Sequence, residues 1–178
     1  MNEIAAEGLQ TSDIDILFDQ IMTDYGQDIL QLTYSYVVNT AIAEDLTQEI
    51  FVKCYHSLPK FEGRSSVKTW LWRIAINHCK DYLKSWHHRK VLLTYEKVPE
   101  AVSSYDTVER AVIRSEEDKN LIKAVLELPV KYREPIYLHY FEELSIKEIA
   151  MLTGIKKNTV KTRIRRATAM LKDSLGGS

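Results

Sequence analysis

The chain has 178 residues, of which 45% are hydrophobic and 28% are charged, so it can form a packed core and is not expected to be disordered overall. No stretch approaches the roughly 18 apolar residues of a membrane span, the acidic N-terminus does not suit a signal peptide, and two cysteines provide neither a disulfide framework nor a metal site. These features predict a cytoplasmic protein that needs no membrane insertion, no metal and no cofactor.

Charge is strongly segregated along the chain, although the net charge is only −1. Residues 1–62 carry a net charge of −9, residues 63–90 carry +6, residues 91–120 carry −3 and residues 156–178 carry +6. Two basic segments in a neutral protein indicate either two contacts with a polyanion or two solvated helix faces.

Helical periodicity dominates the sequence and predicts an all-α fold. Residues 1–12 are expected to form a disordered tail. A helical pattern follows from Asp13 to Val38, in which Gly26 is expected to mark a break or bend between two helices. The next helix is predicted from Ala43 to Leu58 and ends at Pro59. Its acidic side is either a solvated face or a surface for a basic partner.

A loop is predicted at residues 61–66, and Ser66 can cap the helix that follows from about Val67 to His87. This helix mixes basic with aromatic residues, which can stack on unpaired bases. Trp70 lies on its apolar stripe and is assigned to the core. Trp72 lies off the stripe and is equally compatible with the core and with the surface.

Residues 91–117 lack a sustained apolar stripe and are predicted to be a flexible linker between two domains. A second helical domain is expected at residues 118–175. Its first two helices are predicted at Asp118–Leu128 and Val130–Phe141, where Pro135 must kink the second helix or mark its true start.

The sharpest local signal is a helix-turn-helix pattern between residues 145 and 172. Ser145 and Glu148 match a capping box, Gly154 occupies a turn position that requires a positive φ, and a basic helix follows from about Lys157. The residues expected to form a buried seam are Ile149, Ala150, Ile155, Val160, Ile164, Ala167 and Leu171. The residues left to contact base edges and phosphates are Lys156, Lys157, Asn158, Thr159, Lys161, Thr162, Arg163, Arg165 and Arg166.

Several short motifs follow one another in a fixed order along the chain. In the first half they are residues 43–51 (AEDLTQEIF), residues 61–65 (FEGRS) and residues 69–77 (TWLWRIAIN) with Asp81. In the second half they are Leu128-Pro129, residues 132–134, Tyr140-Phe141, Ile149-Ala150, Gly154-Ile155 and residues 159–167 (TVKTRIRRA). Together they resemble the sigma-70 family of RNA polymerase subunits, specifically the small extracytoplasmic-function (group 4) sigma factors.

The resemblance implies a region 2 domain at residues 13–90 and a region 4 helix-turn-helix domain at residues 118–175. Such a protein directs core RNA polymerase to specific promoters. The residues implied to bind the β′ clamp coiled coil are Asp45, Gln48 and Glu49. The residues implied to bind the −10 element are Phe61, Arg64, Ser65, Arg73, Asn77, Lys80 and Lys84. The −35 element is implied to be bound by the nine residues named above for the helix-turn-helix, from Lys156 to Arg166. Region 4 is also implied to bind the β flap of the polymerase.

The resemblance also implies an anti-sigma factor partner, a role in stress responses and a monomeric free protein. Asn158 stands where the family often has Gly, and Ile76 where Arg is common, so the base-by-base specificity does not transfer. One alternative is a stand-alone helix-turn-helix regulator that binds DNA as a dimer. An enzyme is not expected, because the sequence has no phosphate-binding loop, nucleophile elbow or metal-ligand cluster.

Overall fold

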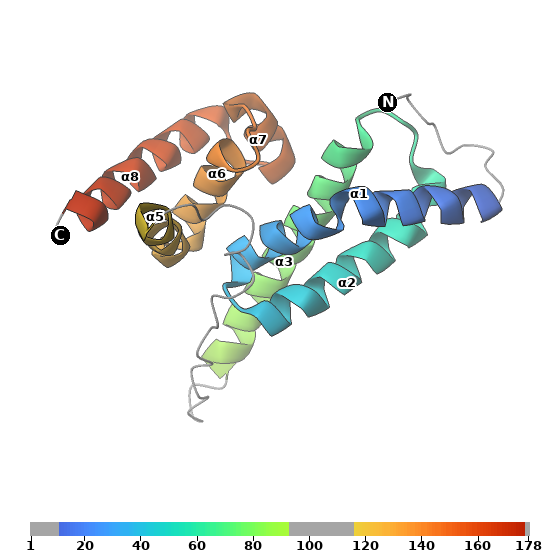
Figure 1. Ribbon diagram of the computed structural model, residues 1–178, viewed down its shortest axis with the longest axis horizontal. Coiled ribbons are helices and arrows are strands. Elements are labelled where there is room, and N and C mark those ends of the chain that lie inside the picture. Colours follow the sequence, from blue (N-terminus) through green and yellow to red (C-terminus); the bar gives the residue numbers. More distant parts are fainter. Residues whose placement is uncertain (1–10, 93–115, 177–178) are drawn as a thin grey trace. The chain divides into compact units, whose positions relative to one another are not determined.

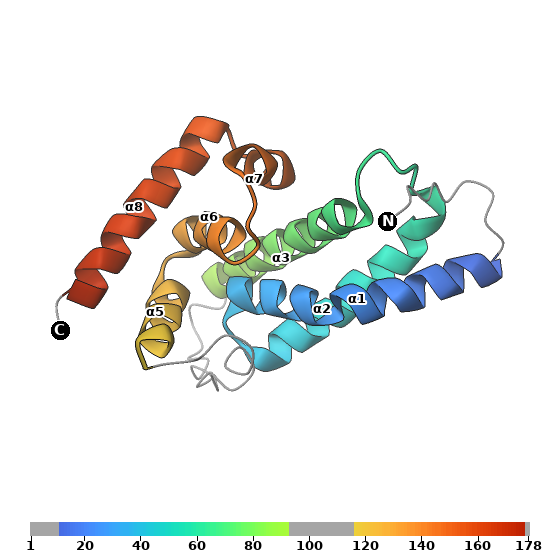
Figure 2. The same ribbon diagram turned by 45° about the horizontal axis from the view of Figure 1, so that its top comes forward.

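A computed structural model describes residues 11–92 and 116–176 of the chain. Every regular element in these two ranges is a helix (Figure 1 and Figure 2), which confirms the all-α prediction. The described residues divide into two compact units, residues 11–33 with 41–92 and residues 34–40 with 116–176. None of the described helices is long and apolar enough to cross a membrane.

Residues 11–92 form three long helices and one short 3-10 turn. They are α1 (Thr11–Val37), α2 (Thr40–Ser57), η1 (Leu58–Lys60) and α3 (Val67–Leu92). Both α2 and α3 are longer than expected, because α2 begins three residues earlier and α3 continues five residues past His87. The predicted tail at 1–12 and linker at 91–117 fall almost entirely outside the described residues.

The break expected at Gly26 does not occur, because α1 is one continuous helix of 27 residues. Glycine in a helix interior costs only about 1 kcal/mol relative to alanine. Ile21, Ile29 and Leu32 lie on both sides of Gly26 and are 2%, 0% and 0% exposed. Burying each such side chain contributes roughly 1.5–3 kcal/mol. The packing of α1 therefore outweighs the local preference of Gly26.

The core face of α3 differs from the predicted stripe. Trp72 is 1% exposed, and its ring meets that of Tyr25 edge-on at 5.7 Å. Trp70 is only half-buried and packs against Phe61, with ring centroids 5.0 Å apart. Ile76 is fully buried. Trp70 therefore lies at the edge of the core, and the helix turns Trp72 and Ile76 fully inward.

The described C-terminal helices are α5 (Glu116–Glu127), α6 (Val130–Tyr140), α7 (Ile146–Thr153) and α8 (Lys157–Gly176). Helix α8 packs against α5, α6 and α7. The core beneath it contains Val125, Leu128, Ile136 and Ala167, with Tyr132, Ile164 and Leu171 packed around them. Long helix α8 is thus held along one side by three shorter helices.

The connection between α5 and α6 depends on a buried arginine. The Arg133 guanidinium donates hydrogen bonds to the carbonyl oxygens of Leu126 and Leu128, the latter at 3.0 Å. Carbonyl groups at the end of a helix lack intrahelical partners, and Arg133 supplies them here. Burial lowers the pKa of Arg133 to about 10, so the group remains charged at neutral pH. Helix α6 starts at Val130 and continues through Pro135, which therefore does not mark its start.

Candidate nucleic-acid interface

Helices α7 and α8 and the turn between them form the predicted helix-turn-helix. The Ser145 backbone N–H donates to Glu148 Oε2 at 2.8 Å, and the Glu148 backbone N–H donates to Ser145 Oγ at 3.3 Å. Gly154 has a φ of 71°, and its N–H closes α7 on the carbonyl of Ala150. Both local predictions, the capping box and the positive φ, are confirmed.

The seam between α7 and α8 decides which side of α8 faces outward. Ile149 and Val160 are fully buried, as is Ala167 further along α8. The other predicted seam residues, Ala150, Ile155, Ile164 and Leu171, are half-buried. This seam fixes one side of α8 against the domain and leaves its basic side accessible.

Most of the candidate DNA-contacting residues in α8, and at Lys156 just before it, are exposed. The exposed ones are Lys156, Lys157, Asn158, Thr159, Lys161, Arg165 and Arg166, and the half-buried ones are Thr162 and Arg163. The Thr162 hydroxyl donates to the carbonyl of Asn158 at 2.9 Å. A hydrogen bond from Arg166 lowers the pKa of Tyr132, with Lys131 adding to the effect, so Arg166 is oriented by α6 as well.

A second basic surface runs along α3. Arg73, Asn77 and Lys84 are exposed and Lys80 is half-buried. Their spacing of four, three and four residues places them in one row along the helix. This row lies off the core face that contains Trp72, so α3 buries one side and presents a polar, basic side.

The loop before α3 splits its candidate residues between core and surface. Phe61 is 5% exposed and packs on Trp70, so its ring supports the loop from beneath. Arg64 is exposed, and its Nε lies 2.5 Å from Glu62 Oε2. Ser65 is half-buried. The Ser66 hydroxyl accepts a hydrogen bond from the Thr69 N–H at 3.1 Å, which confirms the predicted cap of α3.

The candidate polymerase-binding residues, Asp45, Gln48 and Glu49, are all exposed on α2. Glu49 is also part of a contact that sequence reasoning missed. Its Oε2 lies 2.7 Å from Nε2 of His78 on α3, and His78 Nδ1 lies 2.7 Å from Nζ of Lys53. The sequence gives no sign of this contact, because a pair 29 positions apart on two helices leaves no local pattern.

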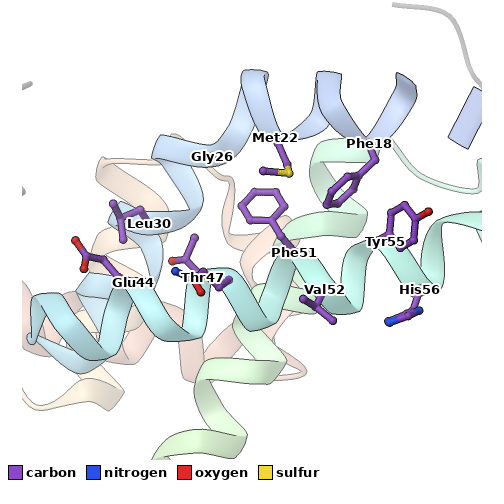
Figure 3. A pocket seen from close by; sticks show the side chains of 11 residues that line it. Phe18, Met22, Gly26, Leu30, Glu44, Thr47, Phe51, Val52, Tyr55 and His56 are labelled. Atoms are coloured by element: carbon purple, nitrogen blue, oxygen red, sulfur yellow. The ribbon is translucent and has the colours of Figure 1, made fainter. Parts of the chain in front are cut away.

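An apolar groove between α1 and α2 was also missed (Figure 3). It has a volume of about 650 Å³. Phe18 and Met22 of α1 face Phe51 and Tyr55 of α2 across it, and Gln48 lines the same groove. The groove forms because α1 runs uninterrupted alongside α2. The sequence did not predict it, because a break in this helix was expected at Gly26.

The two parts of the chain match family models of two regions that occur together in one class of protein. The model of sigma-70 region 2 matches residues 21–89, and the model of sigma-70 region 4 matches residues 118–171. Each match covers one of the two helical surfaces described above. Together they define a transcription initiation subunit of the sigma-70 type.

Known relatives narrow this class. The chain is 33% identical to the ECF RNA polymerase sigma factor SigW of Bacillus subtilis, over 89% of this chain and 88% of the relative. It is 32% identical to the sigma factor SigV of the same organism, over 86% and 88%. The chain belongs to the extracytoplasmic-function group of the sigma-70 family, the alternative sigma factors that direct core RNA polymerase to promoters.

Two solved structures share the fold. The sigma factor RpoE of Bartonella quintana, determined with the anti-sigma factor NepR, aligns with a TM-score of 0.72 and 24% identity, over 89% of this chain and 96% of that one. CnrH, determined with the cytosolic domain of CnrY, aligns with a TM-score of 0.62 and 23% identity, over 90% and 88%.

Proposed function

We propose that this sigma factor recognises its promoters through two separate basic surfaces, one in each matched region. The observation that carries the proposal is the row of polar and basic side chains on α3 together with the exposed basic side of α8. Each surface lies opposite a packed face, and each has the charge that a nucleic acid requires.

In region 4, the N-terminal turn of α8 enters the major groove of the −35 element. Asn158, Thr159 and Lys161 are exposed at that end and carry groups that can read base edges. Arg165 and Arg166 follow one turn later and neutralise phosphates, which fixes the register of the helix on the duplex.

In region 2, the loop at residues 61–66 and the row on α3 contact the −10 element. Arg64 and Ser65 lie at the surface of the loop, while Phe61 holds the loop in shape from beneath. One DNA strand runs along α3 and is contacted by Arg73, Asn77, Lys80 and Lys84.

Asp45, Gln48 and Glu49 bind the β′ clamp coiled coil of the polymerase, and region 4 binds the β flap. The acidic side of α2 is suited to a basic protein surface, since complementary charge speeds association and selects the partner. The protein therefore works in the cytoplasm, where polymerase and promoter DNA are found. It is itself a specificity subunit without catalytic activity, and it is monomeric until it joins the polymerase.

An anti-sigma factor controls this sigma factor, as the solved complex of the similar RpoE with NepR suggests by analogy. The apolar groove between α1 and α2 is a suitable place for such an inhibitor, because Gln48 belongs both to the groove and to the proposed polymerase surface. An amphipathic inhibitor helix in the groove would compete directly with the polymerase.

Run-off transcription with purified core polymerase on a promoter library tests the proposed function. We expect initiation from a distinct set of promoters only when sigma factor and core enzyme are both present. Sequence-specific, tight binding of duplex DNA by the sigma factor alone, without any stimulation of the core enzyme, would instead support a stand-alone regulator.

A further inference from the structure

His78 lies between two oppositely charged side chains of α2. Its Nε2 is 2.7 Å from Oε2 of Glu49, and its Nδ1 is 2.7 Å from Nζ of Lys53. The His78 side chain is 12% exposed, whereas the Glu49 side chain is 59% exposed. The ring is thus enclosed by the protein while the carboxylate that it contacts remains accessible to a partner.

The two contacts determine which ring nitrogen of the neutral imidazole carries the proton. A lysine ammonium group has only donors, so His78 Nδ1 must accept the hydrogen bond from Lys53 and carries no proton. The single proton of the neutral ring then lies on Nε2, which donates it to the Glu49 carboxylate. Lys53 fixes the tautomer, and the tautomer supplies the donor that Glu49 requires.

The surroundings keep this arrangement polar and open. The three residues lie in a cleft of about 550 Å³ between α2 and α3, which Asp45 and Asp81 also line. An exposed glutamate normally samples many rotamers and loses that freedom when it binds. A carboxylate that is already held in one position loses less conformational entropy on binding. Its affinity for the partner is therefore higher without any new contact.

We propose that His78 is a positioning residue for polymerase binding: it holds the Glu49 carboxylate in the conformation that meets a cationic group of the polymerase. The inference rests on the proposed function, in which Glu49 contacts the core enzyme. His78 itself touches no polymerase group and acts only through Glu49.

Two substitutions of His78 separate the two hydrogen bonds. In His78→Gln the side-chain amide reaches the place of Nε2 and still donates to Glu49. In His78→Asn the shorter amide takes the place of Nδ1, so that it accepts from Lys53 and leaves Glu49 without its donor. The Kd of the full-length protein for core polymerase is measured for both variants.

We expect His78→Asn to weaken core binding about tenfold, the equivalent of one hydrogen bond to a charged group. His78→Gln should stay within about twofold of the unsubstituted protein. A double-mutant cycle adds Glu49→Gln, and His78→Asn should have no further effect in that background. His87→Asn, an exposed histidine later on α3, is the matched control.

The outcomes distinguish the inference from the proposed function. If Glu49→Gln leaves core affinity unchanged, the assignment of Glu49 to the polymerase surface is wrong. If Glu49→Gln weakens binding but His78→Asn does not, positioning by His78 is overturned. Equal losses in the Asn and Gln variants would also overturn it, because they would indicate a purely structural role. His78→Ser removes the same donor and serves as the second test if the Asn variant does not fold.

Discussion

Ser145 and Glu148 cap helix α7 reciprocally, since the backbone N–H of each residue donates to the side chain of the other, at 2.8 Å and 3.3 Å. The hydroxyl and the N–H of Ser145 hold the pKa of Glu148 below its usual range. This cap sets where the first helix of the helix-turn-helix begins, and its strength can be measured.

Replacing Ser145 by alanine should destabilise α7 by about 1 kcal/mol, because one of its first N–H groups loses its acceptor. The contribution of Glu148 is present above the ordinary pKa of a glutamate and is lost as the pH falls through the lowered pKa. Hydrogen exchange of the α7 amides at neutral and acidic pH measures both effects. Ser174→Ala, on an exposed position of α8, should leave the exchange rates unchanged.

Alanine substitutions at two glycines should have opposite effects. Gly154 has a φ of 71°, which strains any residue with a Cβ, so Gly154→Ala should cost about 1 kcal/mol or more. Gly26 lies inside α1, and a Cβ there meets no atom within 4 Å. Gly26→Ala should therefore stabilise the protein by roughly 0.5–1 kcal/mol. Thermal unfolding measures both, and destabilisation by Gly26→Ala would contradict the helical account of this position.

Alanine at Lys161 or Arg165 should weaken binding of the holoenzyme to promoter DNA. Removing one cation from the phosphate backbone should reduce the slope of log K against log salt by about 0.9. Lys172→Ala makes the same change in charge at an exposed position near the C-terminal end of α8 and is the control. Unchanged slopes at both Lys161 and Arg165 would contradict placement of this helix in the groove.

Charge reversal at Asp45, as in Asp45→Lys, should weaken core polymerase binding at least tenfold, since it places a cation on a surface proposed to meet cations. Circular dichroism should show an unchanged fold, because the residue is exposed. Asp24→Lys is the matched control: it is an exposed acidic residue of α1 that lines neither of the two clefts described above. An equal loss in both variants would indicate a general charge effect and not a defined contact.

Features that depend on neighbouring residues could be predicted from the sequence. The capping box at Ser145 and the positive φ at Gly154 involve groups within a few positions of one another. The same holds for the cap at Ser66. Helical spacing fixes such patterns before any tertiary contact forms.

Features that depend on distant contacts could not be predicted in this way. The continuity of α1 at Gly26 results from burial of its neighbours, which local propensity does not include. Apolar residues occur on several sides of α3, so helical spacing alone does not show which of them face the core. The contact of Trp72 with Tyr25 on α1 shows that Trp72 does. The link from His78 to Glu49 joins two helices and has no periodic signature. The identity of the two domains as regions 2 and 4 is implied by the family resemblance and not by such local patterns.

All three tryptophans, Trp70, Trp72 and Trp86, and both cysteines, Cys54 and Cys79, precede residue 101. Cys54 and Cys79 are fully buried, and burial raises the pKa of the Cys54 thiol to about 12. Indole emission and alkylation of these thiols are therefore natural optical and chemical probes of region 2 alone. Comparing them with far-ultraviolet dichroism, to which both regions contribute, would reveal whether the two halves melt together or one at a time, without attaching any label.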